Sequence, residues 1–297
     1  MEKICYIDRQ SGKIEVEEVF GESAVRLLYG QSFLSKTIGK LVLHLFAKWS
    51  FFSRIYGWLQ TRPSSRKKIL PFVKRFDIDV SEFEKPIERF SSFNDFFIRG
   101  LQPTARPIAS SAAVIPADGR YRFYPEVRKT DRFSVKKQPF CLESVLKNAE
   151  LADRFDGGTL IIARLCPTDC HRFYFPIDCL PAESQVINGK LFSVNPIAIT
   201  DNPWIWAENK RVLTPLTSKE FGSVLFMEVG ATNVGSIIQT YTPHTPYKKG
   251  SEKGFFSFGG SALLIFFERG RIILDADLIG HDKEVRCLIG QSLGNVH

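Results

Sequence analysis

The stretch Phe255-Phe256-Ser257-Phe258-Gly259-Gly260-Ser261-Ala262-Leu263-Leu264-Ile265-Phe266-Phe267 is the most informative part of the chain. Its aromatic and aliphatic residues predict a buried β-strand, but two glycines interrupt the pattern. Glycines inside a strand weaken it and leave a backbone that bends or that another group can approach closely. The hydroxyl of Ser261 follows an unhindered carbonyl and could attack the peptide bond that precedes it. A β-bulge with an outward serine is the alternative that these residues leave open.

Further strands are predicted on both sides of this stretch. Residues 158–165, 223–241 and 271–278 are apolar, β-branched or aromatic runs bounded by Gly, Pro and Asn. Helical patterns lie earlier, at residues 34–49 and 91–97, and the Ala- and Ser-rich residues 109–113 follow two prolines as a plausible linker. We therefore predict an α+β chain. Residues 1–105 form its mainly helical, basic part, and residues 106–297 form a β-rich core that resembles a sandwich or barrel.

The basic charge is confined to one segment. The 297 residues carry a formal net charge of +8, but residues 21–75 alone hold eleven Lys and Arg against the single acid Glu22. Within this segment, apolar residues recur at helical spacing between residues 34 and 49, roughly opposite Lys36, Lys40 and Lys48. This pattern, followed by aromatic residues 51–59, is typical of a helix that docks on an anionic membrane surface. A helical subdomain packed on its own core remains the alternative, and no nucleic-acid-binding motif accompanies the charge.

Several other classes of protein are disfavoured. No apolar stretch is long enough to span a membrane, and the charged start of the chain lacks the apolar region of a signal peptide, so we expect an intracellular protein. The six scattered cysteines are expected to be reduced. Cys166, Cys170, His171 and Cys179 lack the second paired set that a zinc site usually has, so we predict no metal. The sequence around Ser292 matches Gly-x-Ser-x-Gly, but only His297 follows it, which leaves a serine hydrolase as a weak alternative.

The chain also carries eight short blocks in a fixed order. They are Tyr6-Ile7-Asp8-Arg9 with Gly12, the basic helical segment, Ser92-Phe93-Asn94-Asp95-Phe96-Phe97, Pro116-Ala117-Asp118-Gly119-Arg120, Cys166-Pro167-Thr168-Asp169-Cys170-His171-Arg172-Phe173, residues 228–237, Lys249-Gly250-Ser251-Glu252-Lys253-Gly254, and Gly259-Gly260-Ser261. In these blocks the sequence resembles the phosphatidylserine decarboxylases, pyruvoyl enzymes that process themselves at a Gly-Ser bond. The resemblance covers nearly the whole chain.

The resemblance implies a reaction, a cofactor and a location. Phosphatidylserine would be decarboxylated to phosphatidylethanolamine through a Schiff base with a pyruvoyl group made from Ser261. Cleavage after Gly260 would leave a heterodimer of a long chain and a 37-residue chain, with a further homo-oligomer left open. Asp118 and His171 would form the relay that activates Ser261. The expected partners are the lipid substrate and an anionic membrane surface, on the cytoplasmic side of the cell membrane, with no nucleic acid.

One departure from the family pattern affects the relay. The family usually shows D-Y-H-R-x-H-x-P and places the charge-relay role on the second His, where this chain has Tyr174. Tyrosine is a poor general base at neutral pH unless its environment shifts its pKa. We therefore expect His171 to supply the base, with Tyr174 as the other candidate. An uncleaved, catalytically silent membrane-binding homologue is the alternative function.

Overall fold

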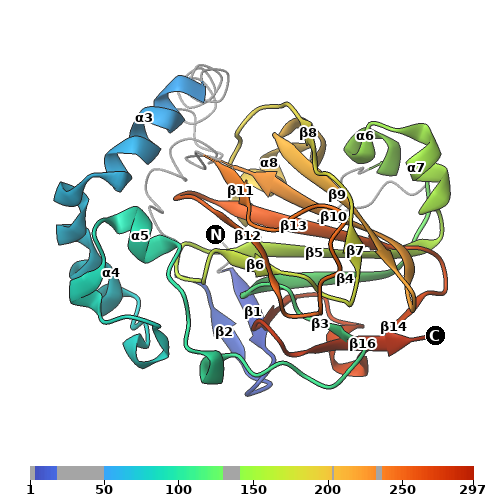
Figure 1. Ribbon diagram of the computed structural model, residues 1–297, viewed down its shortest axis with the longest axis horizontal. Helices are drawn as coiled ribbons and strands as arrows, with labels where there is room; N and C mark the ends of the chain where they lie inside the picture. The colour runs from blue at the N-terminus through green and yellow to red at the C-terminus, as the bar shows by residue number, and fades with distance from the viewer. Residues whose placement is uncertain (1–3, 19–49, 130–140, 203, 232–235) are drawn as a thin grey trace.

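The computed structural model describes residues 4–18, 50–129, 141–202, 204–231 and 236–297, so the predicted helix at residues 34–49 lies outside the described residues (Figure 1). The strands are β1 (Cys5–Asp8), β2 (Ile14–Val16), β3 (Ala113–Val114), β4 (Gly119–Val127), β5 (Gly158–Leu165), β6 (Arg172–Tyr174), β7 (Leu180–Pro181), β8 (Gln185–Ile187), β9 (Arg211–Ser218), β10 (Gly222–Gly230), β11 (Ile237–Gln239), β12 (Glu252–Phe256), β13 (Ser261–Phe267), β14 (Ile272–Leu274), β15 (Glu284–Cys287) and β16 (Ser292–Val296). The α-helices are α3 (Ser50–Thr61), α4 (Ile69–Arg75), α5 (Phe93–Phe97), α6 (Leu142–Leu146), α7 (Ala149–Arg154), α8 (Pro196–Asp201) and α9 (Ile205–Glu208). Short 3-10 helices are η2 (Pro63–Lys68), η3 (Val80–Glu82), η4 (Ile87–Arg89), η5 (Pro103–Ala105) and η6 (Ala276–Leu278).

One large mixed sheet forms the centre of the molecule. Its strand order is β2-β1-β15-β4-β5-β13-β10-β9-β7, with β8 also paired to β9. Neighbouring strands are antiparallel except β1 and β15, which are parallel. Every residue of β5 and β13 is buried, because these two central strands are covered on both faces. Burial on both faces explains why their sequences are continuous apolar runs rather than alternating ones.

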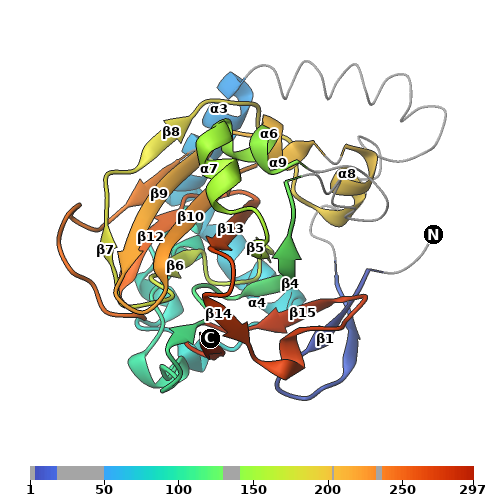
Figure 2. The ribbon, with the colours of Figure 1, turned by 90° about the vertical axis from the view of Figure 1, so that its right-hand side faces the viewer.

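Different layers cover the two faces of the large sheet. One face packs against two three-stranded sheets, β11-β12-β6 and β14-β16-β3, around a core that includes Phe173, Phe226 and Leu263. The other face packs against α6, α7, α8 and α9, through residues such as Val145 and Trp206. In both ribbon views the central strands β13 and β5 lie between α6 and α7 above and β14 below (Figure 1, Figure 2). The predicted β-rich core is therefore confirmed.

The predicted strands match with three corrections. The run 223–241 is divided between β10 of the large sheet and β11 of a three-stranded sheet. The run 158–165 is β5 throughout. The run 255–267, expected as a single interrupted strand, is the end of β12 in one sheet and all of β13 in another. Residues 257–260 carry the chain between the two sheets, and Gly259 has a φ of +146°, which favours glycine. The expected strand at 271–278 ends at Leu274 and continues as η6.

A helical region packs at one end of the sheet, on the left in Figure 1. It comprises α3, η2, α4 and α5. Its core is a cluster of aromatic rings in which Phe72, Phe93 and Phe96 meet edge to face. Phe258, from the segment between β12 and β13, belongs to the same cluster. The helical region therefore contacts the chain directly before Ser261.

Candidate active site

The fold brings the predicted site residues to one end of the large sheet. Ser261, the first residue of β13, pairs with Leu165 at the end of β5 and with Gly230 at the end of β10. Asp118 directly precedes β4, which pairs with β5, and His171 lies on the loop that follows β5. Because β4, β5 and β13 are antiparallel neighbours, the start of β4, the end of β5 and the start of β13 share one end of the sheet.

Ser261 is fully buried, and its Oγ has no hydrogen-bond partner among the residues that the structure describes. Its side chain lies on the same face of β13 as Leu263, the face that packs against β6 and β12. Gly230, its cross-strand neighbour on β10, has no side chain. Leaving a buried hydroxyl unpaired costs stability, so such a group is a candidate for a chemical role.

His171 is fully buried and neutral. Its Nδ1 lies 3.0 Å from the carbonyl oxygen of Asp169. A carbonyl can only accept, so Nδ1 carries the proton and Nε2 keeps a lone pair. In the described part of the chain, Nε2 has no hydrogen-bond partner. The ring packs on Phe97 with centroids 3.8 Å apart, and burial lowers the pKa of His171 to about 3.

Asp118 is buried and held by other groups. Arg106 donates to both of its carboxylate oxygens, from Nε at 3.1 Å and from Nη2 at 2.8 Å, and the backbone N–H of Ile289 donates to Oδ1 at 2.8 Å. Arg106 also bonds Glu82, so the guanidinium lies between two carboxylates. Within the described residues, no hydrogen bond joins Asp118 to His171 or to Ser261. The three residues thus share one end of the sheet without forming a continuous relay.

Tyr174, at the end of β6, lies where the family usually has its second His. Burial raises the pKa of its hydroxyl, and the nearby Cys170, Glu252 and Asp118 raise it further. The phenol therefore stays protonated at neutral pH and can donate a hydrogen bond, but it cannot act as an efficient general base. At neutral pH, Tyr174 therefore supplies even less phenolate than a free tyrosine does, which leaves His171 as the better candidate for the base.

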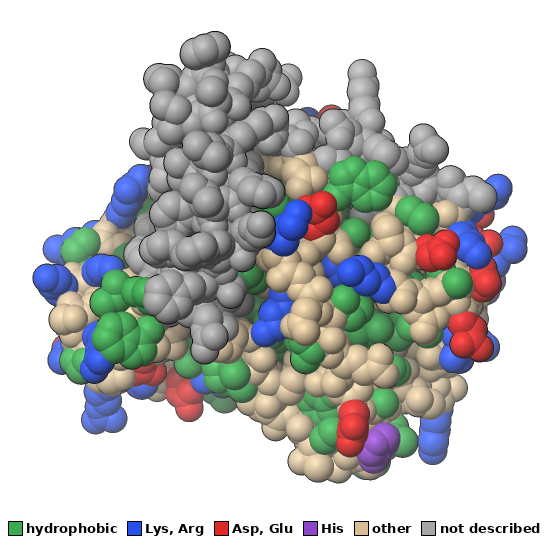
Figure 3. All heavy atoms as spheres, turned by 90° about the horizontal axis from the view of Figure 1, so that it is seen from above, with side chains coloured by type: hydrophobic (Ala, Val, Ile, Leu, Met, Phe, Trp, Pro, Cys, Tyr) green, Lys and Arg blue, Asp and Glu red, His purple; other side chains and the backbone are tan. Residues whose placement is uncertain are grey.

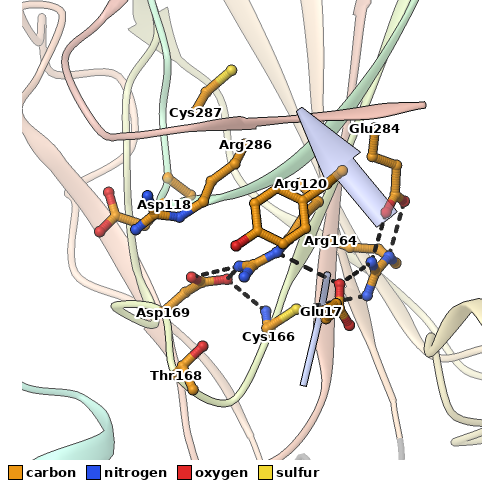
Figure 4. A network of polar contacts seen from close by, with 12 residues as sticks. Glu17, Asp118, Arg120, Arg164, Cys166, Thr168, Asp169, Glu284, Arg286 and Cys287 are labelled. Carbon is orange, nitrogen blue, oxygen red and sulfur yellow. Dashed lines mark hydrogen bonds and ion pairs between the residues drawn. The ribbon is translucent and has the colours of Figure 1, made fainter. Parts of the chain in front are cut away.

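A buried network of charges holds the loop that carries His171 (Figure 4). Arg120 donates to both oxygens of Asp169, at 2.6 and 2.7 Å, and Asp169 in turn accepts from the backbone N–H of Cys166 at 2.7 Å. Glu17, which directly follows β2, accepts from Arg164 at 2.8 Å and lies 3.6 Å from Arg120. The guanidinium of Arg120 keeps the pKa of the Asp169 carboxyl below its usual value despite burial. The network therefore fixes the backbone carbonyl that orients His171.

Sequence reasoning did not single out Glu17, Arg120 or Asp169 as site residues. Arg120 and Asp169 fall inside two of the quoted blocks, so their position in the sequence was the available signal. No sequence signal pointed to Glu17, because it lies about 150 residues from Arg164, its ion-pair partner in the fold. Ser292, by contrast, is the first residue of β16 and pairs with Val114. It lacks the strand-to-helix turn of a nucleophile elbow, so the serine hydrolase hypothesis is wrong.

Comparison with known proteins identifies the family. A family model for phosphatidylserine decarboxylase matches residues 93–295. A phosphatidylserine decarboxylase proenzyme of Chlamydia felis is 48% identical over 299 residues, covering 99% of this chain and 98% of the relative. Proenzymes of the same name from Chlamydia caviae and Chlamydia trachomatis serovar D are 47% and 44% identical, with 99% and 98% of this chain covered. The chain belongs to the phosphatidylserine decarboxylase family and is a decarboxylase.

Proposed function

We propose that the chain cuts itself between Gly260 and Ser261 and that residue 261 then carries a pyruvoyl group on which phosphatidylserine is decarboxylated. The observation that carries this proposal is the buried, unpartnered Oγ of Ser261, directly after a Gly-Gly segment in an unusual backbone conformation. The relatives' printed name, proenzyme, agrees with a chain that matures by cleavage.

Cleavage and formation of the pyruvoyl group together consume one water and release one ammonia. The Ser261 hydroxyl loses its proton to a base, and Oγ attacks the carbonyl carbon of Gly260. The C–N bond breaks, the nitrogen takes up a proton, and an ester links the two residues. Removal of the Cα proton of Ser261 then expels the Gly260 carboxylate by breaking the Cβ–Oγ bond. The dehydroalanine left at position 261 tautomerises and is hydrolysed by one water, which releases ammonia and leaves the pyruvoyl group.

The surroundings of Ser261 fit such a group. It would keep the Cα and Cβ of Ser261, so it needs no more space than the side chain already occupies beside Gly230. It supplies an electrophilic carbonyl that accepts the amine of the substrate and the electron pair released with CO2. The site lies in a buried region, where the reacting atoms are shielded from bulk water.

We assign the base role to Nε2 of His171. Its lone pair is free, and burial keeps the imidazole neutral at neutral pH. Within the residues that the structure describes, no hydrogen bond joins Nε2 to the Ser261 hydroxyl, so the two groups must come together for proton transfer. Asp118 is proposed as the acidic member of the relay. Its carboxylate would exchange Arg106 for the Nδ1–H of His171, which in this structure donates to the carbonyl of Asp169. Asp118→Ala and His171→Ala should therefore both leave a folded, uncut chain.

The substrate also suggests where the protein works. A lipid held in a bilayer must be reached from the membrane surface, and the helical region presents Lys, Arg and exposed apolar side chains at the end of the sheet where Ser261 lies. No helix within the described residues is long and apolar enough to cross a bilayer. We propose peripheral association with the cytoplasmic side of the cell membrane, through anionic lipids.

The deciding experiment is the intact mass of the purified protein together with its activity. We expect two chains, residues 1–260 and a short chain in which a pyruvoyl group replaces Ser261. The short chain should resist Edman sequencing because it lacks an α-amino group, and it should react with hydrazine. Ser261→Ala should give a single full-length chain that releases no CO2 from phosphatidylserine, because the hydroxyl needed for the first step is missing.

Ser292→Ala is the matched control. It removes another serine hydroxyl from a strand but leaves the Gly-Ser bond intact, so cleavage and CO2 release should equal those of the wild type. A wild-type protein that stays uncut and inactive would instead support a catalytically silent, membrane-binding homologue. Undiminished CO2 release by purified Ser261→Ala would refute the assignment of residue 261.

A further inference from the structure

Helix α5 contacts both halves of the candidate site. Asn94 accepts a hydrogen bond through Oδ1 from the backbone N–H of Phe258, at 2.8 Å. Phe97, three residues later, packs on the ring of His171 and also on the ring of Phe258, with centroids 4.9 Å apart in the second pair. One turn of helix therefore contacts the proposed base and the segment that ends at the proposed scissile bond.

The segment 257–260 needs such a contact because it crosses between two sheets. On its N-terminal side, the N–H of Ser257 donates to the carbonyl of Ser236 at 3.0 Å. The next residue is fixed by Asn94, and after it come two glycines, of which Gly259 has a φ of +146°. Two adjacent glycines have more backbone freedom than any other residue pair, so fixing the residue before them limits how the carbonyl of Gly260 can point.

Asn94 is itself held firmly. The hydroxyl of Ser92 accepts from the N–H of Asp95 and caps the start of α5. The N–H of Phe93 donates to Oγ of Ser65 in η2, at 2.8 Å, and Lys85 bonds the carboxylate of Asp95. A side chain on an element anchored in this way can position a partner more reproducibly than a side chain on a free loop.

We propose that Asn94 is a positioning residue for self-cleavage. Its Oδ1 fixes the N–H of Phe258 and so keeps the carbonyl of Gly260 within reach of the Ser261 hydroxyl. Asn94 does not touch the reacting atoms. This inference rests on the proposed function, and it adds a residue from the helical region to the machinery that matures the enzyme.

The test compares cleavage rates of variants made by cell-free translation, so that the uncut chain can be followed as it converts to two fragments. Asn94→Leu keeps the size of the side chain but removes the acceptor, and we expect cleavage to slow about tenfold, the effect of losing one hydrogen bond in the reactive geometry. Asn94→Asp keeps an oxygen acceptor and should cleave at close to the wild-type rate.

Asn148→Leu is the matched control. Asn148 also accepts from a backbone N–H, that of Leu151 at 3.0 Å, but it caps α7 on the face of the sheet opposite to the one on which Ser261 lies. Its loss should lower the thermal unfolding temperature without changing the cleavage rate. Unfolding temperatures of Asn94→Leu and Asn148→Leu are compared in the uncleavable Ser261→Ala chain, so that lost stability is separated from lost positioning.

Three outcomes would count against the proposal. If Asn94→Leu cleaves at the wild-type rate, Asn94 has no positioning role, although self-cleavage at Ser261 still holds. If Asn94→Asp is as slow as Asn94→Leu, the acceptor is not the cause of the effect, and the proposal is equally overturned. If the wild-type chain itself is never cut, the proposed function fails, and the role of Asn94 fails with it.

Discussion

At the scale of single residues, His171 has two properties that the sequence does not contain. It is neutral because the ring is buried, and it has a defined tautomer because the carbonyl of Asp169 accepts from Nδ1. Burial depends on Phe97, which is 74 positions earlier in the chain and meets the ring only after folding. The charge state of His171 could therefore not be predicted from the sequence, and its role as the base stays a proposal.

The buried imidazole makes stability depend on pH. The pKa of His171 falls from 6.5 to about 3 on folding, so between these values the unfolded chain binds a proton that the folded chain does not. Stability is therefore lost as the pH falls through this range, at up to about 1.4 kcal/mol per pH unit. In the uncleavable Ser261→Ala chain, His171→Leu should remove this part of the pH dependence, as measured by urea unfolding at several pH values.

Two comparisons check this prediction. Above pH 7 both proteins hold position 171 uncharged, so their unfolding free energies should change with pH in parallel. Below pH 6 the curve of the His171→Leu chain should fall less steeply than that of its parent. Equal slopes at pH 4 to 6 would mean that the imidazole is protonated in the folded protein, and the base role of Nε2 would then lose its support.

The sequence alone showed that Tyr174 departs from the family pattern, but it could not predict the direction in which the fold shifts the pKa of Tyr174. The sequence revealed that a histidine is missing from the usual pattern, and the reference pKa of tyrosine already made it a poor base. Whether the fold would lower or raise that pKa depended first on burial of the hydroxyl and then on Cys170, Glu252 and Asp118, which come from three segments. They raise it, so the alternative in which Tyr174 supplies the base is disfavoured.

At the scale of elements, the sequence predicted the individual strands better than it predicted which sheet each strand joins. The runs that became β5 and β13 were recognisable because strands buried on both faces are continuously apolar. The change of sheet at residues 257–260 was not recognisable, since the same apolar pattern continues through it. Two glycines were the available signal, and they were equally compatible with a bulge.

The hairpin of β1 and β2 illustrates a long-range element contact. Glu17, directly after β2, lies between Arg164 of β5 and Arg120 of β4, and all three side chains are buried. The two arginines keep the pKa of the Glu17 carboxyl below its usual value although burial acts in the opposite direction. The hairpin therefore contributes a charge to the network that holds the loop of His171.

Removing the charge of Glu17 should lower the stability of the protein. Glu17→Ala leaves two buried guanidinium groups without one of their carboxylates, and we expect the free energy of unfolding to fall by about 3 kcal/mol. We also expect slower cleavage, because Arg120 fixes Asp169 and with it His171. Denaturant unfolding of the Ser261→Ala chain measures the first effect, and a cleavage time course measures the second.

The adjacent residue gives the control. Glu18 is exposed and pairs with Arg75 at the surface, at 3.0 Å, so Glu18→Ala should cost less than about 1 kcal/mol and leave cleavage unchanged. If Glu17→Ala were as mild as Glu18→Ala, the network would have no structural importance for the site.

At the scale of the whole molecule, the helical region and the candidate site lie at the same end. Asn94, Phe97 and Phe258 join α5 to the start of β13, and Ser65 joins α5 to η2. β1 and β2, near the N-terminus, belong instead to the large sheet. The contacts between the helical region and the β-rich core are therefore extensive. The division of the chain at residue 105 into a basic helical part and a catalytic core stays a prediction.

The surface of the helical region combines charge with apolar side chains. Trp58, Leu59 and Leu70 are exposed on α3 and α4, and Arg62 lies over the ring of Trp58 at 3.9 Å. Lys67 and Lys74 are exposed on η2 and α4. Seen from above, Lys and Arg side chains and apolar side chains lie next to one another at this end of the molecule (Figure 3). Such a surface suits the boundary between lipid headgroups and acyl chains.

We therefore predict that the protein binds anionic bilayers through this surface. Each basic residue close to an anionic surface contributes about 1 kcal/mol before salt screening, so Lys67→Glu with Lys74→Glu should weaken co-sedimentation with anionic liposomes by at least about tenfold at low salt. Lys219→Glu with Arg269→Glu makes the same change in charge at the far end of β9 and β13, away from Ser261, and should have little effect.

Binding of the wild type should also decline as salt is added. Equal binding to neutral and anionic liposomes, or equal loss in both double variants, would show that this surface does not recognise anionic lipid, and substrate would then have to reach Ser261 by another route.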